Sequence, residues 1–421
     1  MEKVSIYLFD KLIAKMYQDE NRIYLEQIDD LCHKASPLMI SKDIKEIETT
    51  NLTYLEQVAG FISDSLPGNF GNEILDNYFL QNKKKYPSIS DKLIFIGNKG
   101  LGALRFEPSI DDENSQLETL ELKSMFEKAK ELKKGGSYHS LQNAFLVSAH
   151  SFVGGARAKA VAAINLEEKR VFLGDRTKPL EKNFIHAIIK YDDTANGDEN
   201  KSTYSKLEYI YYLLAKKADI NISDCYLIEA DGKFHFVTKR FDIEANAKRY
   251  HVHSLAGLLH NDYNIPRQIG YEDLLRTAVK LGAIGSLKQL FSQMIFNYMF
   301  VNQDDHTRNF SFMTDEDFVW RATPAYDLTF AKGKKQTIEH QLLLYGKNLS
   351  QINLEDITRL ADEFSIDLEF VSILIENIKA LRQNEFPKLL KKYNIKEEKT
   401  KQVLSEINKR TFQGAISWVI Y

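Results

Sequence analysis

The sequence contains very little cysteine: Cys32 and Cys225 are the only two among 421 residues. Two cysteines cannot build the disulfide framework of a small secreted domain, so we expect a protein of the reducing cytoplasm. Long apolar runs are also missing, since no stretch approaches the roughly 18 apolar residues of a membrane span. The start, MEKVSIYLFDKLIAKM, carries acidic residues and lacks the pattern of an export signal. These absences predict a cytoplasmic protein with no membrane partner.

An excess of positive charge is absent as well. Lys and Arg total 56 and Asp and Glu total 59, which gives a formal net charge of −3. A protein that binds DNA by itself usually carries a basic excess, so any contact with nucleic acid is expected to come through a partner. The composition is that of an ordinary globular chain, with 43% hydrophobic and 27% charged residues. Its length allows two or three domains at roughly 100–200 residues each.

The first 108 residues mix short strand-like runs with turns. VSIYLF alternates between apolar and polar residues, and DKLIFIGNKGLGALRFEP is typical of two strands about a glycine turn. Gly97, Gly100 and Gly102 also suit a phosphate-binding loop, but no amphipathic helix follows them directly. We therefore expect a small mixed amino-terminal subdomain with a plain turn at these glycines.

The rest of the chain changes from strand-like to helical sequence. Residues 109–140 are expected to form a helical connector, acidic at its start, basic at its end and closed by Gly135 and Gly136. Residues 141–421 begin with glycine-rich, strand-like sequence and become mainly amphipathic and helical from about Leu287. Strands followed by helices favour an α+β catalytic domain with a largely helical carboxy-terminal lobe.

The segment FVNQDDHTRNFSFM, residues 300–313, places a run of polar residues between apolar flanks. A periodic apolar helix is expected before it and a short strand after it, so the loop between them can hold Asp304 and Asn309 in one cluster. A carboxylate that accepts a proton, followed by an amide oxygen that binds Mg²⁺, is the arrangement of kinase catalytic loops. The alternative is that these residues only form turns through bonds to the backbone.

A second carboxylate lies in the apolar segment TPAYDLTFA, at Asp327. An isolated buried carboxylate is costly unless it is paired or bound to a metal. A hairpin would bring Asp327 beside Asn309 as a second oxygen ligand, which suits Mg²⁺ that carries nucleotide phosphates. The alternative is an Asp that caps a turn.

Three further segments could complete a nucleotide site. In SFVGGARAKA, Gly154 and Gly155 allow backbone N–H groups to approach phosphate while Arg157 and Lys159 supply charge, although an ordinary glycine hairpin is the alternative. Lys190 ends the apolar strand FIHAIIK, from which it could reach phosphates or extend to water. Glu208 follows on an amphipathic helix, where it could pair with Lys190 or remain exposed.

Glycine loop, strand lysine, helix glutamate, Asp–Asn loop and final Asp occur in this order, and with them the sequence resembles the HipA family of bacterial toxin kinases. The resemblance runs from residue 1 to about residue 400 and rests on GFISDSLPGNFG, GLGALRFEP, GGARAK, HAIIKY, TKRFD, NQDDHTRNFSF and PAYDLTF. The last two are specific in combination. The resemblance implies a protein-kinase-like fold and an ATP- and Mg²⁺-dependent serine/threonine protein kinase.

The resemblance also implies partners. The expected substrate is a protein of the translation machinery such as an aminoacyl-tRNA synthetase, glutamyl-tRNA synthetase in the best-known case, whose phosphorylation arrests growth. A small HipB-like helix-turn-helix antitoxin is expected to bind both the kinase and operator DNA, which agrees with the lack of basic excess. Two other functions stay open: a small-molecule phosphotransferase, and a catalytically silent corepressor that assists a DNA-binding antitoxin.

Site residues follow from the resemblance by position. Asp304 corresponds to the general base, Asn309 and Asp327 to the metal ligands, and Lys190 to the lysine that binds phosphate. His306 and Arg308 occupy the histidine and basic positions of the catalytic loop. The remaining nucleotide-side positions are Gly154, Gly155, Ala156, Lys159, Glu208, Phe241 at the adenine-contacting hinge, and Tyr326.

Two positions depart from the family pattern. Lys239 precedes Arg-Phe-Asp at the hinge, where the family often has an acidic residue. In the glycine loop, Phe152 holds the register of a serine that well-studied members phosphorylate, and Ser151 lies one position earlier. We hypothesise that a second copy of the enzyme phosphorylates Ser151 and so switches the enzyme off. The alternative is that Ser151 only bonds the turn.

Overall fold

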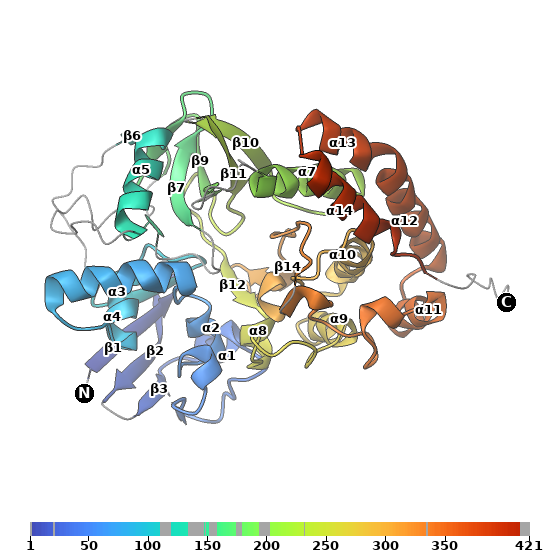
Figure 1. Ribbon diagram of the computed structural model, residues 1–421. Helices are drawn as coiled ribbons and strands as arrows, with labels where there is room; N and C mark the ends of the chain where they lie inside the picture. The colour runs from blue at the N-terminus through green and yellow to red at the C-terminus, as the bar shows by residue number, and fades with distance from the viewer. Residues whose placement is uncertain are drawn as a thin grey trace.

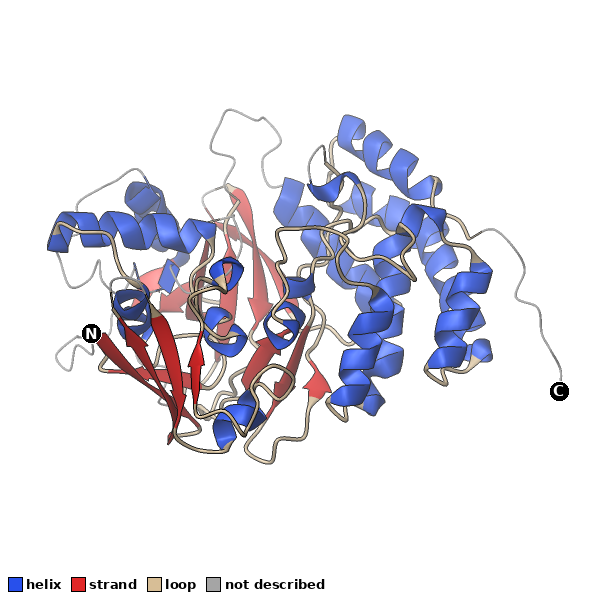
Figure 2. Cartoon of the chain, turned by 90° about the horizontal axis from the view of Figure 1, so that it is seen from below, coloured by secondary structure: helices blue, strands red, loops and turns tan. Residues whose placement is uncertain are grey.

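The computed structural model describes residues 2–19, 22–109, 119–133, 147, 149–150, 158–173, 179–192, 203–230, 232–333 and 336–412. Figure 1 shows two groups of strands at one end of the molecule and a large helical lobe at the other. The second view shows the same division, with most strands on one side and most long helices on the other (Figure 2). The expected order of strands first and helices after is confirmed.

Among the described residues, the first sheet has five antiparallel strands in the order β4-β3-β2-β1-β5. Val4, Ile6 and Leu8 of β1 are buried in alternation, as VSIYLF predicts. The strands are β1 Glu2–Leu8, β2 Lys11–Gln18, β3 Ile23–Gln27, β4 Glu46–Glu48 and β5 Leu104–Glu107. Around them lie α1 Leu31–Ala35, η1 Thr53–Leu55, α2 Gly60–Ser63, α3 Asn69–Lys83 and α4 Ile89–Ile96.

One predicted strand is wrong. The apolar run before the glycine turn forms helix α4, because Ser88 caps its first turn in a reciprocal capping box with Asp91. Short apolar runs fit strands and buried helices equally well by periodicity. The turn after α4 packs on another part of the chain: the Gly102 N–H donates to Asp242 at 2.6 Å. This bond agrees with the plain turn that we expected there.

Within the described residues, the second sheet has six antiparallel strands in the order β10-β11-β9-β7-β8-β6. They are β6 Thr119–Glu121, β7 Lys159–Asn165, β8 Arg170–Phe172, β9 Phe184–Lys190, β10 Cys225–Ala230 and β11 Lys233–Lys239. Helix α5 (Leu122–Lys133) follows β6, and helix α7 (Thr203–Lys217) packs against β10 and β11. One hydrophobic core joins both sheets, since Val4 and Ile6 share it with Ile189 and Val237. The boundaries predicted at residues 108 and 140 remain predictions.

The helical lobe carries a small sheet, β12-β13-β14, at its inner side. Its strands are β12 His251–Ser254, β13 Ser311–Thr314 and β14 Arg321–Ala322. The helices are α8 Leu255–Leu259, α9 Tyr271–Lys280, α10 Leu287–Met299, α11 Leu354–Glu363, α12 Leu368–Ala380, α13 Phe386–Lys392 and α14 Glu397–Asn408. Shorter helical turns are η2 Ile284–Ser286, η3 Thr307–Asn309, η4 Gln336–Ile338, η5 Leu349–Gln351 and the π-helical η6 Leu381–Glu385. No helix among the described residues is long and apolar enough to span a membrane.

The amino-terminal subdomain touches the helical lobe where α2 meets α8. A Cβ added to Gly60 would lie 2.1 Å from the carbonyl oxygen of Gly257, so the two backbones can touch only because residue 60 is a glycine. Beside this contact, the Gly60 N–H donates to His260 Nε2 at 3.1 Å. Asp64 accepts hydrogen bonds from the backbone N–H of Ser254 and from its hydroxyl, at 2.7 and 2.6 Å. The first subdomain is therefore tied directly to the lobe that carries the polar loop.

Candidate active site

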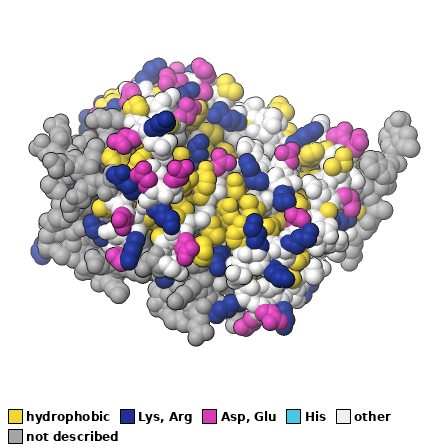
Figure 3. Space-filling model, turned by 90° about the horizontal axis from the view of Figure 1, so that it is seen from above, with side chains coloured by type: hydrophobic (Ala, Val, Ile, Leu, Met, Phe, Trp, Pro, Cys, Tyr) yellow, Lys and Arg dark blue, Asp and Glu magenta, His cyan; other side chains and the backbone are white. Residues whose placement is uncertain are grey.

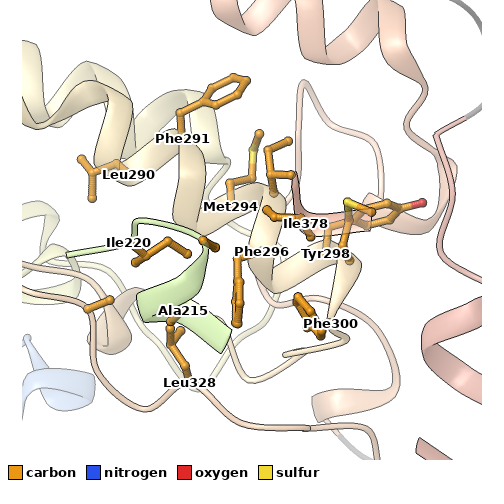
Figure 4. Close-up of a cluster of buried hydrophobic side chains, with 14 of the residues drawn as sticks. Ala215, Ile220, Leu290, Phe291, Met294, Phe296, Tyr298, Phe300, Leu328 and Ile378 are labelled. Carbon is orange, nitrogen blue, oxygen red and sulfur yellow. The ribbon is translucent and has the colours of Figure 1, made fainter. Parts of the chain in front are cut away.

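Buried elements on both sides hold the polar loop of residues 302–309. Helix α10 delivers the chain, and Phe300 at its end lies in the same buried cluster as Phe291 and Met294 (Figure 4). Tyr211 donates a hydrogen bond to the carbonyl of Phe300. Val301 then adopts φ +56°, a conformation rare for a β-branched residue, which costs on the order of 1–3 kcal/mol. The expected helix, loop and strand β13 are all present.

Asp305 is the structural carboxylate of the loop. Its side chain is fully buried, and Oδ2 accepts hydrogen bonds from the Tyr271 hydroxyl at 2.6 Å and from His340 Nδ1 at 2.8 Å. Oδ1 accepts from the backbone N–H of Gln341 at 2.7 Å. A buried carboxylate with three donors is satisfied and fixed. Asp305 therefore anchors the loop to α9 and to the segment after Asp327.

Asp304 points the other way. Its side chain is 48% exposed, and Oδ1 lies 4.0 Å from His306 Nε2. The neighbouring Asn309 donates its Nδ2 to the backbone carbonyl of Asp304 at 2.7 Å. This bond fixes the orientation of the Asn309 amide and leaves its Oδ1 as the acceptor end of the side chain. The loop thus presents an accessible carboxylate next to an oriented amide oxygen.

Lys190, the last residue of β9, is the centre of the charged cluster. Its ammonium group donates to Glu208 on α7 and to Asp327 on the segment after β14. Burial opposes its charge, but the carboxylates of Asp327 and Glu208 raise the pKa of Lys190 above its usual value. The predicted pair between Lys190 and Glu208 is confirmed, and Glu208 is buried rather than exposed.

A second lysine lies beside this cluster. Lys159 is the first residue of β7, is buried, and is directly opposite Lys190 in the antiparallel register. Residues that face each other across such a pair project from the same side of the sheet. The positive charge of Lys159 also acts on Asp327. Two cations therefore converge on the region in front of Asp327.

Asp327 is ionised and accessible. Burial opposes its charge, yet Lys190, Lys159 and His306 hold the pKa of this carboxyl well below its usual range. Its backbone has φ +53°, a left-handed conformation that Asp tolerates, and its side chain remains 38% exposed. The next residue, Leu328, lies in the buried cluster of Figure 4 and so anchors the segment.

Tyr326 connects the two polar segments. Its hydroxyl donates to the carbonyl of Arg308 at 2.8 Å and shares a hydrogen bond with the Ser311 hydroxyl at 2.6 Å. These bonds place the Tyr326 side chain against residues 308–311; the closeness of Asp327 to Asn309 stays a prediction. The described residues contain no group of three His, Cys, Asp or Glu that could hold a metal ion by themselves. Asp327 and Asn309 instead offer two oxygen ligands.

The nucleotide-side residues are partly placed. Phe241 follows β11 and its ring centroid lies 6.0 Å from that of Tyr326. The residues on either side of Phe241 in the sequence, Arg240 and Asp242, form a buried ion pair at 2.6 Å. The predicted phosphate-loop residues Gly154, Gly155 and Ala156 and the hypothetical phosphosite Ser151 lie outside the described residues.

Arg308 is turned away from the charged cluster. Its guanidinium donates to the Ser63 hydroxyl at 3.0 Å and stacks over the ring of Tyr263 at 4.3 Å. Its contacts are therefore with the amino-terminal subdomain and the loop after α8, not with Lys190 or Asp327. Nothing local in the sequence indicates the contact with Ser63, because 245 residues separate the two.

The sequence also gave no sign of the residues that fix Asp305. Tyr271 and His340 lie 34 and 35 residues from it and belong to no recognisable motif. The facing position of Lys159 was equally hidden, because it depends on strand register, which sequence spacing does not specify.

The family model for the HipA-like C-terminal domain matches residues 151–410. Among solved structures, HipA of Shewanella oneidensis MR-1, in its complex with HipB and operator DNA, is similar over 96% of this chain and 95% of its own, with 14% identity and a TM-score of 0.67. The Helicobacter pylori proinflammatory kinase CtkA covers 55% of this chain and 88% of its own, with 12% identity. Its TM-score of 0.33 is too low to establish a shared fold. Because the family model spans more than half of the chain, the protein belongs to the HipA family.

Proposed function

We propose that the protein is an ATP- and Mg²⁺-dependent serine/threonine protein kinase, the toxin of a HipA–HipB-like pair, with a protein-kinase-like fold. One observation carries this proposal: Lys190 is held between Glu208 on a helix and Asp327 on the segment after the polar loop. Kinases need such a strand lysine, paired with a helix glutamate, together with a metal-binding Asp.

The residues present fit Mg²⁺ and a nucleotide. Asp327 is ionised and accessible, and Asn309 has its amide nitrogen engaged, so both can offer oxygen to a hard cation. Mg²⁺ binds through one or two carboxylates and completes its shell with water and substrate phosphates. Lys190 and Lys159 would hold the phosphates, and Phe241 with Tyr326 would contact the base. Bound Mg²⁺-ATP would supply the γ-phosphoryl group.

Asp304 is placed to act as the general base. Its carboxylate is exposed next to His306. The carboxylate oxygens of the adjacent Asp305 instead accept three buried hydrogen bonds. In transfer, Asp304 takes the proton of the acceptor hydroxyl while the new O–P bond forms and the bond to the ADP leaving group breaks. Asn309 keeps the backbone of Asp304 in position through its hydrogen bond.

The proposed partners follow from the family and from charge. The Shewanella protein is seen with HipB and operator DNA. We propose that a HipB-like antitoxin binds this chain and provides most of the contact with operator DNA. On the described part of the face in Figure 3, Lys and Arg are interspersed with Asp and Glu, in keeping with the net charge of −3. The proposed substrate is a translation protein such as an aminoacyl-tRNA synthetase.

Transfer from labelled ATP tests the proposal. The purified protein is incubated with γ-labelled ATP, Mg²⁺ and a cell lysate, alongside the Lys190→Met variant. Labelled protein bands that require Lys190 would support a protein kinase. Label found only in small molecules would identify a phosphotransferase instead. No transfer by a folded protein that still binds its antitoxin would identify a silent corepressor.

A further inference from the structure

Arg308 projects from the polar loop toward the amino-terminal subdomain. It lies between His306 and Asn309 in the sequence, and its guanidinium donates to the Ser63 hydroxyl at 3.0 Å, at the end of α2. The same nitrogen lies 3.5 Å from the carbonyl oxygen of Ser63. The face of the guanidinium stacks on the Tyr263 ring at 4.3 Å. A planar guanidinium that is bonded at its edge and stacked on its face has a fixed orientation.

Ser63, the partner of Arg308, is held against the helical lobe. It is fully buried. The next residue, Asp64, accepts hydrogen bonds from His253 Nδ1 at 2.7 Å and from the backbone N–H and hydroxyl of Ser254 at 2.7 and 2.6 Å. Burial opposes the charge of Asp64, but His253 and Arg308 hold the pKa of this carboxyl below its usual value. Arg308 is therefore attracted to Asp64 as well as bonded to Ser63.

The backbone of Arg308 meets the residues of the proposed chemistry. Its carbonyl accepts a hydrogen bond from the Tyr326 hydroxyl at 2.8 Å, and Tyr326 directly precedes Asp327 in the sequence. On the other side, Asn309 follows Arg308 and donates to the Asp304 carbonyl at 2.7 Å. A shift of Arg308 would therefore be passed on to Asp304, Asn309 and Asp327.

Groups that act in transfer must be held to within about 0.5 Å, and the contacts behind them supply this precision. We propose that Ser63 and Arg308 are positioning residues, which hold the polar loop so that Asp304 and Asn309 face the reacting groups. They act through these two residues and not by contact with the substrate. This inference rests on the proposed kinase activity, and it makes the amino-terminal subdomain necessary for that activity.

Two other roles of Arg308 would give different results. A cation in a catalytic loop could bind phosphate directly, and Ser63 would then be dispensable for transfer. A contact that only stabilises the fold would change the melting temperature and leave transfer by the folded protein unaffected. The direction of the Arg308 side chain, toward Ser63 and Asp64, favours positioning over phosphate binding.

A double-mutant cycle tests the inference. Ser63→Ala and Arg308→Gln remove the contact from either side, and the double variant shows whether the two residues act together. Ser65→Ala is the matched control, because Ser65 is another buried serine two residues along the chain. The measurements are the rate of transfer from saturating Mg²⁺-ATP to lysate protein, the affinity for metal-free ATP, and hydrogen exchange of residues 302–311. All are made well below the melting temperature of every variant.

Each single variant should lose about 10–100-fold in transfer rate, the usual cost of losing a contact behind metal ligands. The double variant should lose no more than the larger single loss, because both changes remove the same contact. Residues 302–311 should exchange faster in all three variants. The affinity for metal-free ATP should stay, since Lys190 is untouched. Ser65→Ala should match the wild type in every measurement.

A wild-type rate for Ser63→Ala would overturn the inference alone. A loss in the double variant equal to the product of the single losses would do the same, because the two residues would then act independently. If the wild type labels no protein, the proposed function fails, and hydrogen exchange decides whether Ser63 holds the loop. Unchanged exchange of residues 302–311 in Ser63→Ala and in Arg308→Gln would show that it does not.

Discussion

Lys159 and Lys190 lie directly opposite each other on the antiparallel strands β7 and β9. Like charges in such a pair are destabilising unless anions compensate them. Glu208 and Asp327 both bind Lys190, and a nucleotide would add further negative charge at the same place. The strands thus tolerate a costly pairing at the point where the proposed chemistry needs two cations.

Removing one partner of the buried ion pair should destabilise the fold. Lys190→Met leaves Glu208 buried without its cation, a change that typically costs about 3–5 kcal/mol. Adding Glu208→Leu should recover part of this loss, because an apolar pair can replace a buried ion pair. Urea unfolding of the single and double variants measures both effects, and neither variant should transfer phosphate. If Lys190→Met were as stable as the wild type, the ion pair between Lys190 and Glu208 would have to be exposed to water in solution.

Asp327→Asn should weaken the binding of Mg²⁺-ATP far more than the binding of metal-free ATP. The amide removes the negative charge that a cation needs and keeps the size of the side chain. Calorimetric titrations with and without Mg²⁺ give the two affinities. Equal losses in the two titrations would mean that Asp327 has a structural role only.

Gly60→Ala should disrupt the contact between α2 and α8. Its Cβ would lie 2.1 Å from the Gly257 carbonyl oxygen, a distance at which the backbones must separate. Gly285→Ala is the matched control, because no atom lies within 4 Å of a Cβ at that position. We expect a lower melting temperature for Gly60→Ala and an unchanged or slightly higher one for Gly285→Ala. Similar melting temperatures for the two variants would contradict the close contact.

Stability should fall as the pH decreases from about 6.5 to about 4. Burial lowers the pKa of both His251 and His260 to about 4, so between these pH values the unfolded chain binds protons that the folded chain does not. Each histidine then reduces stability by about 1.4 kcal/mol for each pH unit, and neither adds a further loss below their folded pKa.

The variant His251→Gln isolates one of these contributions. His251 bonds the Ala35 carbonyl at 2.8 Å, and a glutamine amide can also donate to that oxygen. In urea unfolding at several pH values between about 4 and 6.5, the free energy of unfolding should change less steeply with pH for this variant. The slope should be smaller by about 1.4 kcal/mol per pH unit, which corresponds to one proton. An unchanged slope would show that His251 titrates normally in the folded protein.

Features that depend on local periodicity could be predicted from the sequence. Helix α10, strand β13 and the pair of Lys190 with Glu208 follow from apolar spacing and the order of segments. The assignment of Asp304 as the general base came from the resemblance and stays a prediction, while the structure shows Asp304 as the exposed aspartate of the pair and Asp305 as the buried one.

The remaining features depend on contacts between distant segments. Arg308 reaches Ser63 across 245 residues, and no local pattern encodes such a contact. Helix α4 was predicted as a strand because its apolar run is short, and the cap at Ser88 that decides the structure precedes the run.

The roles of the two adjacent aspartates provide the most direct test of the kinase proposal. The measurement is the rate of γ-phosphoryl transfer from Mg²⁺-ATP to protein, for Asp304→Asn and Asp305→Asn, together with the melting temperature of each. Asp304→Asn should keep the wild-type melting temperature and lose about 10²–10⁴ in rate, the usual contribution of a positioned base. Asp305→Asn should lower the melting temperature, because it weakens three buried hydrogen bonds. A wild-type rate for Asp304→Asn, or an inactive Asp305→Asn of unchanged stability, would contradict the assignment of Asp304 as the base.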